Sequence, residues 1–309
     1  MAQVTAIIPA YGHHYLTSQA VARLRSQSLP PVEIIVVDDG SSSPFPLADE
    51  SRMRVIRHSV NRGFAASVNT GLRACQTDLV AILNNDVTLA PDWLERLATV
   101  ISLQAADFAC GKLYRPDGLI DGTFDLICRG GLAWRAGAGR PDGDLWSRPQ
   151  PVAFTSFTAV LGKTASFLLD ETYHSYYEDV EWSLRSAILN KKGYFDPSAT
   201  GIHTGSATAG AWSYFATRQL LRNHRRLAHQ YLLPDYQTEY RIARTLFRAH
   251  CLNHGQWPDI PKELIEPKPK PAQLASILQT SETLLRELQM ASGPDRLWRW
   301  YFELAGRLT

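Results

Sequence analysis

The sequence predicts an α/β fold, in which a mostly parallel sheet is flanked by helices and followed by a helical C-terminal extension. Two observations lead to this prediction. Over the first hundred residues, short apolar runs alternate with stretches whose apolar residues recur at helical spacing, as in strands joined by crossover helices. Beyond residue 214 the periodicity is helical. The composition, 45% hydrophobic and 20% charged over 309 residues, provides enough apolar side chains for one large core or two smaller ones.

The elements of the first hundred residues are predicted from where apolar runs meet turn-forming residues. The first strand ends at Pro9, the second at Asp38-Asp39-Gly40 and the fourth at Asn84-Asn85-Asp86. Pro91 suits the first turn of a helix. The expected strands cover residues 4–8, 33–37, 54–58 and 79–83. The expected helices cover residues 16–24, 64–74 and 91–101.

Regular patterning fades in the middle of the chain and then returns. Residues 116–151 contain seven glycines without apolar periodicity, which predicts a long mobile loop. A helix is expected over 180–188, ended by Gly193, with Glu178 and Asp179 at its N-terminal edge. The helices beyond residue 214 are interrupted by a proline-rich stretch, 260–271, of the kind that forms a stiff linker.

Charge and cysteine usage narrow the function classes. The net charge of +2 gives no reason to expect a nucleic-acid partner, although residues 215–309 carry fourteen basic and nine acidic side chains. The four cysteines lack the spacing of a zinc site or a disulfide framework, so a reducing cytosol is the expected compartment. Since no apolar run approaches the ~18 residues of a spanning helix, membrane contact is expected to be peripheral.

Polar side chains end two of the predicted strands and should meet at one edge of the sheet. Ligands bind at this edge in open α/β folds. The sequence has no glycine-rich phosphate loop, so a bound diphosphate would need a metal ion to offset its charge. Asp86 offers the hard oxygen ligand that Mg²⁺ or Mn²⁺ takes. Taken alone, each polar cluster is more often a turn or a cap.

A third cluster places carboxylates among aromatic residues, in Tyr176-Tyr177-Glu178-Asp179-Val180-Glu181-Trp182. Acidic residues at a helix start are favoured by the macrodipole alone. The aromatic setting would also desolvate a carboxylate and hold its pKa high enough for a general base. His203, taken by itself, is more often a structural histidine than a ligand.

The order of these motifs closely resembles family-2 inverting glycosyltransferases of the GT-A fold, and within them the bacterial rhamnosyltransferases. The resemblance covers about residues 3–225. It rests on Asp38-Asp39-Gly-Ser-Ser, the segment 61–71, Leu83-Asn-Asn-Asp86, the segment 177–185 and His203. It implies a GT-A catalytic domain over 1–214, with a nucleotide-binding half (1–105) and an acceptor and catalytic half (106–214), and a helical region over 215–309.

The resemblance implies a nucleotide site built from residues that follow the first strands. Pro9, Ala10 and Tyr11 would line the base pocket, and Asp39 would accept a hydrogen bond from a pyrimidine N3–H. Asn85 would face the ribose, and Arg62 and Asn69 would lie near the nucleotide.

The resemblance also implies the groups that carry the chemistry. Asp86 would hold Mg²⁺ or Mn²⁺ on the diphosphate, and His203 would complete the metal site. Asp179 would be the catalytic base that deprotonates an acceptor hydroxyl, and Glu178 would be the next candidate for that role. No covalent nucleophile is required, because the anomeric configuration inverts in one displacement.

The implied reaction moves a sugar from a nucleotide-sugar donor to a hydroxyl of a glycan or lipid-linked oligosaccharide, in bacterial surface polysaccharide synthesis. The preferred donor is dTDP-L-rhamnose, and a UDP-hexose is the alternative. Tyr11-Gly12 and Ala165-Ser-Phe-Leu-Leu169 depart from the family pattern and leave the sugar open. A catalytically silent nucleotide-sugar-binding module and a nucleotidyltransferase are alternatives, although Ala10-Tyr-Gly-His-His14 lacks the basic phosphate loop of the latter.

The C-terminal region combines arginines with aromatic residues. Such helices suit the surface of an anionic membrane, which would place the protein in the cytoplasm at the inner face of the plasma membrane. Alternatively, the basic run is a solvated face and the aromatics pack onto the catalytic domain or a second subunit of a homo-oligomer. The basic run is Arg218, Arg222, Arg225, Arg226 and His229, and the later group is Arg296, Trp298, Arg299, Trp300, Tyr301, Phe302 and Arg307.

Overall fold

The computed structural model describes residues 2–46, 52–205, 212–260 and 263–308, and the side chain of Arg307 lies outside this description. The chain divides into two compact units. The first comprises residues 1–124 and 137–208, and the second comprises 125–136 and 209–309. The functional division into 1–214 and 215–309 stays a prediction.

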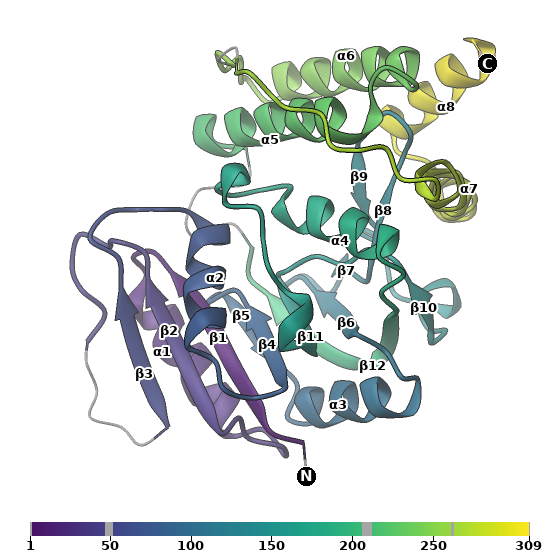
Figure 1. The fold of residues 1–309 in the computed structure, drawn as a ribbon. Coiled ribbons are helices and arrows are strands. Elements are labelled where there is room, and N and C mark those ends of the chain that lie inside the picture. Colours follow the sequence, from purple (N-terminus) through teal and green to yellow (C-terminus); the bar gives the residue numbers. More distant parts are fainter. Residues whose placement is uncertain (1, 47–51, 206–211, 261–262, 309) are drawn as a thin grey trace. The chain divides into compact units, whose positions relative to one another are not determined.

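The first unit is built on a ten-stranded sheet (Figure 1). The strand order is β10-β12-β6-β11-β4-β1-β2-β3, with β5 paired to β12 and β7 paired to β6. The strands are β1 (Val4–Ala10), β2 (Glu33–Asp38), β3 (Met53–Arg57), β4 (Leu79–Leu83), β5 (Val87–Leu89), β6 (Phe108–Tyr114), β7 (Ile120–Gly122), β10 (Gln150–Val152), β11 (Ala159–Lys163) and β12 (Gly193–His203).

Strand direction brings the predicted polar loops to one edge of this sheet. β1 to β4 are mutually parallel along the order β4-β1-β2-β3. β11 runs antiparallel to both β4 and β6, and β12 is parallel to β6, so β6 and β12 share the direction of β4. The carboxyl ends of β1, β2, β4 and β12 therefore lie at the same edge, as the sequence predicted for a mostly parallel sheet.

Helices cover both faces of the sheet. Because successive residues of a strand point to opposite faces, neighbouring residues pack against different helices. Ile8 and Val36 share an apolar cluster with α1 (His14–Arg25) and α3 (Trp93–Leu103). Their neighbours Ile7 and Ile35 share the opposite cluster with α2 (Phe64–Ala74) and α4 (Glu178–Ile188). In the second cluster Trp182 of α4 is fully buried and stacks on Phe167 at a centroid distance of 4.8 Å.

The expected long loop over residues 116–151 contains regular elements, so that prediction was wrong. The segment holds β7, β8 (Asp125–Ile127), β9 (Ala133–Arg135), the 3₁₀ turn η1 (Asp144–Trp146) and the start of β10. Each strand that lies within it is three residues long. Such strands are too short for the alternation of apolar and polar residues that identifies a strand in a sequence.

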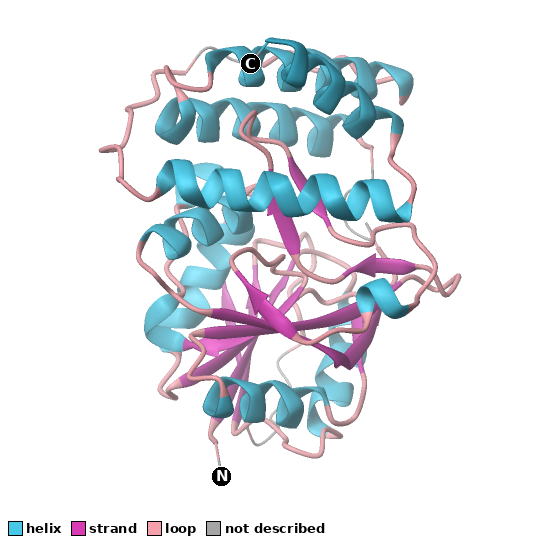
Figure 2. Cartoon of the chain, turned by 90° about the vertical axis from the view of Figure 1, so that its right-hand side faces the viewer, coloured by secondary structure: helices cyan, strands magenta, loops and turns pink. Residues whose placement is uncertain are grey.

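The second unit is mostly helical, as expected, and includes the short hairpin β8–β9 (Figure 2). The helix α7 (Leu274–Ser292) binds this hairpin. The Ile127 N–H donates to Ser281 Oγ at 2.8 Å, and the Arg129 N–H donates to Glu282 Oε2 at 2.6 Å. No described residue between 254 and 273 is helical. The helices are α5 (Tyr214–Leu227), the π-helical turn η4 (Ala228–Leu232), α6 (Gln237–Asn253), α7 (Leu274–Ser292) and α8 (Arg296–Leu308).

The aromatic residues of α8 mostly face the interior of the second unit. Trp298, Tyr301 and Phe302 are at most 9% exposed, whereas Trp300 is 45% exposed. The Tyr301 hydroxyl also lies 3.1 Å from Glu282. These three side chains therefore pack within the unit and offer no apolar face to a membrane. Among the described helices, none combines the length and hydropathy needed to cross a bilayer.

Candidate active site

Asp86, His203 and Asp121 form a cluster at the carboxyl edge of the sheet. β12 pairs with β5 so that His203 lies opposite Val87, directly after Asp86. His203 Nε2 is 3.3 Å from Asp86 Oδ1, and His203 Nδ1 is 2.9 Å from Asp121 Oδ2. All three side chains are at most 16% exposed. The sheet thus joins two residues predicted for one metal site and adds a carboxylate that the sequence analysis did not assign.

The two carboxylates control the charge of the His203 ring. Burial by itself lowers the pKa of the imidazole, but the hydrogen bonds and negative charges of Asp121 and Asp86 outweigh it and raise the pKa to about 9. In the absence of another cation the ring therefore carries a positive charge between two acids. The cluster is arranged to hold positive charge at this point.

The cluster fits a divalent cation in part. Adjacent donors of an octahedral Mg²⁺ at about 2.1 Å lie about 3 Å apart, close to the separation of His203 Nε2 and Asp86 Oδ1. Asp121 at Nδ1 would fix the tautomer that exposes Nε2 to an ion. No described group of three or more protein ligands could hold a metal alone. Substrate phosphates would have to supply further ligands, as Mg²⁺ sites often require.

Asp39 is buried after β2, and the backbone fixes its orientation. Oδ1 accepts hydrogen bonds from the Arg62 N–H at 2.8 Å and from His58 Nδ1 at 2.7 Å. Oδ2 accepts one from the Gly63 N–H at 2.8 Å. A carboxylate has about four acceptor sites, so one site on Oδ2 is still open. A ligand N–H can therefore be accepted there without breaking an internal bond.

Its neighbour Asp38 has a structural role instead. The carboxylate accepts from the backbone N–H of Ser41 and of Phe45, both at 3.0 Å, and pairs with Arg57 at 2.6 Å. Burial alone would raise its pKa, but these hydrogen bonds and the Arg57 charge hold it below its usual value. The loop that follows β2 is folded around this side chain.

Asn69 and Arg62 both reach the segment that precedes α4. The Asn69 amide donates to the Leu169 carbonyl at 2.9 Å and to Glu171 Oε1 at 3.0 Å, and its oxygen accepts from the Leu169 N–H. Arg62 pairs with Glu171 at 3.2 Å. Both amide hydrogens of Asn69 are used in this way, so the structure does not bring Asn69 to the cluster, and its contact with a nucleotide stays a prediction.

The remaining predicted nucleotide residues line the edge near β1 and β4. Pro9 and Ala10 belong to β1, and Tyr11, directly after the strand, is 46% exposed. Asn85 is 7% exposed and donates from its amide to Thr17 Oγ1 of α1 at 3.0 Å. Register places Ala10 beside Asp38, so Tyr11 and Asp39 emerge next to each other.

The segment that leads into α4 has unusual backbone angles. His174, Tyr176 and Tyr177 have φ values of +61°, +67° and +69°, a region that side-chain-bearing residues rarely occupy. The start of α2 packs against this segment. The Ala65 N–H donates to the His174 carbonyl, and a Cβ on Gly63 would lie 2.6 Å from His174. Strain of this kind persists where packing enforces it, and it is common at functional sites.

Glu178 and Asp179 begin α4 directly after this strained segment, in different environments. Glu178 is 6% exposed, and its Oε2 has no hydrogen-bond partner among the described residues. Burial and the neighbouring Asp179 charge raise the pKa of Glu178 well above its usual value, which favours its protonated form. Asp179 is less buried, and its Oδ1 accepts from the Val180 N–H at 2.8 Å. The helix N-terminus favours its charged form.

The side chains that fix these groups could not be predicted from the sequence. Asp121 lies in the segment expected to be a loop, and His58 lies at the end of a strand, so neither stood out by spacing. Glu171 joins α2 to the segment before α4 by accepting from Asn69, Arg62 and Arg73. Pairing across more than eighty residues, as between Asp121 and His203, leaves no local signal in a single sequence.

A comparison with family models matches residues 5–167 to glycosyl transferase family 2, which is more than half of the chain. The chain belongs to this family. The matched region contains β1, β2 and β4 with Asp39 and Asp86, whereas α4 and His203 lie beyond it.

Curated relatives match this chain over shorter stretches. It is 40% identical over 98 residues to the pre-mycofactocin glycosyltransferase of Mycobacterium tuberculosis, covering 30% of this chain and 20% of that protein. It is 30% identical over 114 residues to the succinoglycan biosynthesis protein ExoO of Rhizobium meliloti, covering 36% of this chain and 33% of that protein. The aligned stretches thus span a third or less of these relatives' length.

Two solved structures share the fold of this chain. GalNAc-T7, solved with UDP, GalNAc and Mn2+, matches with a TM-score of 0.63 at 13% identity, covering 100% of this chain and 57% of that chain. The mannosyltransferase PcManGT from Pyrobaculum calidifontis, in complex with GDP-Man and Mn2+, matches with a TM-score of 0.55 at 14% identity, covering 99% and 86%. The predicted GT-A fold is confirmed.

Proposed function

We propose that this chain is a metal-dependent, inverting glycosyltransferase that transfers a sugar from a nucleotide-sugar donor to a hydroxyl of a glycan or lipid-linked acceptor. The observation that carries this proposal is the placement of Asp86 and His203 Nε2, 3.3 Å apart at the carboxyl edge of the sheet. That edge is where a nucleotide diphosphate would lie in an open α/β fold. Both structural neighbours were solved with Mn2+ and a nucleotide or nucleotide sugar, which adds support.

Asp86 and His203 would hold Mg²⁺ or Mn²⁺, with Asp121 orienting the imidazole. When bound, such an ion stabilises the negative charge that grows on the leaving diphosphate, a contribution of several kcal/mol in metal-assisted transfers in general. His203 must lose its proton to act as a ligand, so the ion and the proton compete for Nε2. Asp39 would accept the pyrimidine N3–H at the open site on Oδ2, with Pro9, Ala10, Tyr11 and Asn85 lining the base and ribose.

Asp179 would act as the general base. It is less buried than Glu178 and lies in the first turn of α4, where the helix N-terminus favours a negative charge that can accept a proton. As the acceptor oxygen attacks the anomeric carbon, its proton passes to Asp179 and the bond from that carbon to the diphosphate breaks on the opposite face. The configuration of the anomeric carbon therefore inverts.

Glu178 would take a different role, because a protonated carboxyl donates a hydrogen bond. Its Oε2 is buried and without a partner among the described residues, which costs free energy unless a ligand supplies one. An oxygen of the donor sugar or the acceptor would satisfy it. In this proposal Asp179 accepts the proton as the base, and Glu178, whose raised pKa favours the neutral form, donates a hydrogen bond.

The proposed donor is dTDP-L-rhamnose, with a UDP-hexose as the alternative. The open acceptor site of Asp39 supports a base with an N–H at its pyrimidine edge, whereas rhamnose rests on the resemblance to rhamnosyltransferases. ExoO carries succinoglycan biosynthesis in its name, which supports a role in polysaccharide synthesis. One structural neighbour was solved with UDP and the other with GDP-Man, so the fold accommodates both bases.

The proposed setting is the cytoplasm, at the inner face of the plasma membrane if the acceptor is lipid-linked. The buried aromatics of α8 remove one basis for membrane contact, and Arg222 and Arg226 are both paired with Glu263 at 2.6 Å. Peripheral contact would therefore depend on the remaining basic residues, and a homo-oligomer stays a further proposal.

A panel of nucleotide sugars tests this function. Purified protein is assayed with Mn²⁺ for thermal shift and for hydrolysis of dTDP-L-rhamnose, UDP-glucose, UDP-GalNAc and GDP-mannose, with Asp86→Ala as the matched variant. We expect dTDP-L-rhamnose to give the largest response and Asp86→Ala to abolish it. A response only to UDP-sugars would overturn the rhamnosyl assignment. Binding without hydrolysis or transfer to any acceptor would favour the silent module.

A further inference from the structure

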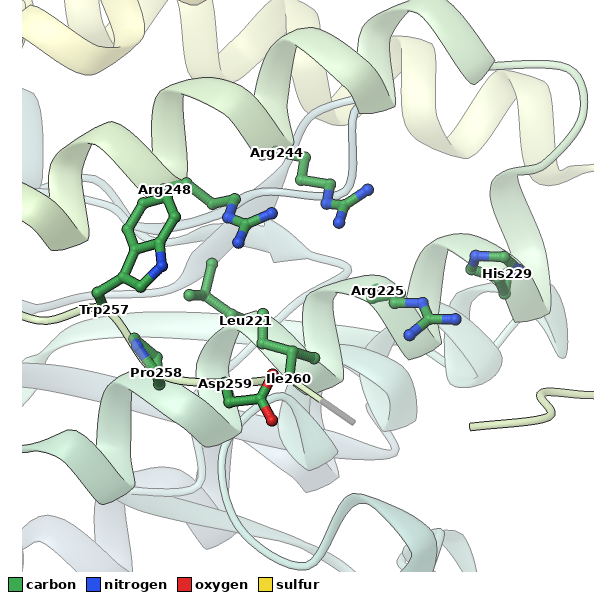
Figure 3. A pocket seen from close by; sticks show the side chains of 9 residues that line it. All are labelled: Leu221, Arg225, His229, Arg244, Arg248, Trp257, Pro258, Asp259 and Ile260. Carbon is green, nitrogen blue, oxygen red and sulfur yellow. The ribbon is translucent and has the colours of Figure 1, made fainter. Parts of the chain in front are cut away.

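The second unit contains a cavity of about 480 Å³ between α5, α6 and the segment that follows α6 (Figure 3). Its volume is within the range of small-molecule sites. The lining combines basic side chains with one tryptophan and an apolar floor. The lining residues are Leu221, Arg225, His229, Arg244, Arg248, Trp257, Pro258, Asp259 and Ile260.

Positive charge dominates this cavity. Arg225, Arg244 and Arg248 contribute three guanidinium groups, against the one carboxylate of Asp259. Figure 3 shows the guanidinium groups of Arg225, Arg244 and Arg248 spread along the cavity. The pKa of His229 at the same wall is lowered by burial and by the charges of Arg225 and Arg244, as expected where the local potential is positive.

Arg244 and Arg248 hold this charge without a counter-charge from the described part of the chain. Neither forms an ion pair with a described carboxylate, whereas Arg222 and Arg226 on α5 share Glu263 at 2.6 Å each. The two arginines are four residues apart on α6, and like charges at this spacing destabilise a helix. A bound anion would relieve this repulsion.

Trp257 extends the cavity with an aromatic face. Its ring is 60% exposed, and the guanidinium of Arg248 lies 4.8 Å from the ring centroid. The contact holds Arg248 in place by a cation–π interaction and fixes the direction of its donors. Leu221 and Pro258 are buried and close the floor with apolar surface.

We propose that this cavity is a second ligand site that binds the phosphate groups of a phosphate ester or diphosphate through Arg225, Arg244 and Arg248. Planar guanidinium groups bind phosphate oxygens in pairs of hydrogen bonds, which makes arginine well suited to such a ligand. Trp257 and the apolar floor would contact the group that carries the phosphate. The site lies within the second unit and does not depend on the identity of the sugar donor.

The same phosphate chemistry can come from a soluble ligand or from a lipid headgroup. The probe for the first source is pyrophosphate, titrated calorimetrically into the full chain with EDTA present, so that a metal-dependent nucleotide site does not respond. The probe for the second is co-sedimentation with phosphatidylcholine vesicles that contain or lack phosphatidic acid.

The test variant is Arg244→Gln/Arg248→Gln, which keeps the length of the side chains while removing their charges. The matched control is Arg241→Gln, an exposed arginine on the same helix that does not line the cavity. We expect the double variant to bind pyrophosphate at least about tenfold more weakly, because charged hydrogen bonds are lost, and the control to bind as the wild type does. Arg244→Lys/Arg248→Lys, which keeps the charge, should fall between them.

The outcomes separate cleanly. Arginine-dependent binding of pyrophosphate alone supports a soluble phosphorylated ligand, and arginine-dependent binding of phosphatidic acid vesicles as well supports a headgroup. Wild-type protein that binds neither probe overturns the proposal. Equal weakening by Arg241→Gln also overturns it, because general surface charge would then explain the binding. Circular dichroism and the melting temperature of each variant establish that it is folded.

Discussion

Acid should destabilise the second unit through His224, a fully buried histidine of α5. Its Nε2 lies 2.9 Å from the Gly130 carbonyl, and the rings of Tyr240 and Phe247 pack against it at centroid distances of 5.4 and 5.9 Å. Burial lowers the pKa of His224 to about 4, the Gly130 hydrogen bond opposes the shift and the Arg244 charge adds to it. The folded protein therefore keeps this ring neutral down to about pH 4.

The sign and size of the effect follow from the two pKa values. Between the unfolded value of 6.5 and the folded value of about 4, the unfolded chain binds a proton that the folded chain does not. Stability is thus full above pH 6.5 and falls as the pH drops through this window. From pH 7 to pH 4.5 the loss due to His224 is about 2 to 3 kcal/mol.

Urea unfolding at pH 7 and at pH 4.5 measures this loss. His224→Gln is the matched variant, because a glutamine amide can donate to the Gly130 carbonyl but does not titrate. Both proteins lose unfolding free energy between pH 7 and pH 4.5. We expect this loss to be smaller in His224→Gln than in the wild type by about 2 to 3 kcal/mol. An identical fall in both proteins would refute the assignment of a buried neutral His224.

Three further predictions concern the candidate active site. Asp121→Asn should weaken Mn²⁺ binding by about 10- to 100-fold, measured calorimetrically with a nucleoside diphosphate present, whereas the control Asp117→Asn at an exposed position should not. Equal Mn²⁺ affinities of Asp121→Asn and the wild type would exclude Asp121 from the site. Gly63→Ala should lower the free energy of unfolding by about 1 to 3 kcal/mol and slow transfer, because the new Cβ would clash with His174. The control is Gly118→Ala, which has a similar φ and no neighbour within 4 Å, so it measures the backbone strain alone. An equal loss of unfolding free energy in both variants would exclude a role for the His174 contact. Glu178→Gln resembles the protonated carboxyl and should retain more transfer activity than Asp179→Asn; the reverse order would make Glu178 the base.

Much of the nucleotide-binding half could be predicted from the sequence because its signals are local. The run Ile34-Ile-Val-Val37 is apolar because β2 is buried on both faces, and the loop after it folds around Asp38 within a few residues. The helix α2 was predicted over the same residues, 64–74, that the structure assigns. A buried parallel strand is recognised in a sequence as a continuous apolar run, and an amphipathic crossover helix as apolar residues at helical spacing.

The remaining features depend on pairings between distant residues. The short strand β7 brings Asp121 to His203, and a strand of three residues has no sequence pattern from which this contact could be predicted. Asn69 is predicted to lie near the nucleotide, and its amide also donates to Leu169 and Glu171, about a hundred residues away, which no local pattern indicates. The aromatics of α8 suited a membrane surface, and only the packing of the second unit shows that Tyr301 is buried.

The most direct test of the proposed mechanism is the rate of sugar transfer by Asp179→Asn at saturating donor. The substitution keeps the shape of the side chain and removes its capacity to accept a proton. We expect a rate about 10² to 10⁴ times lower than that of the wild type, while the affinity for the nucleoside diphosphate stays within a few-fold. Near-normal transfer by a folded Asp179→Asn protein would contradict the assignment of Asp179 as the base.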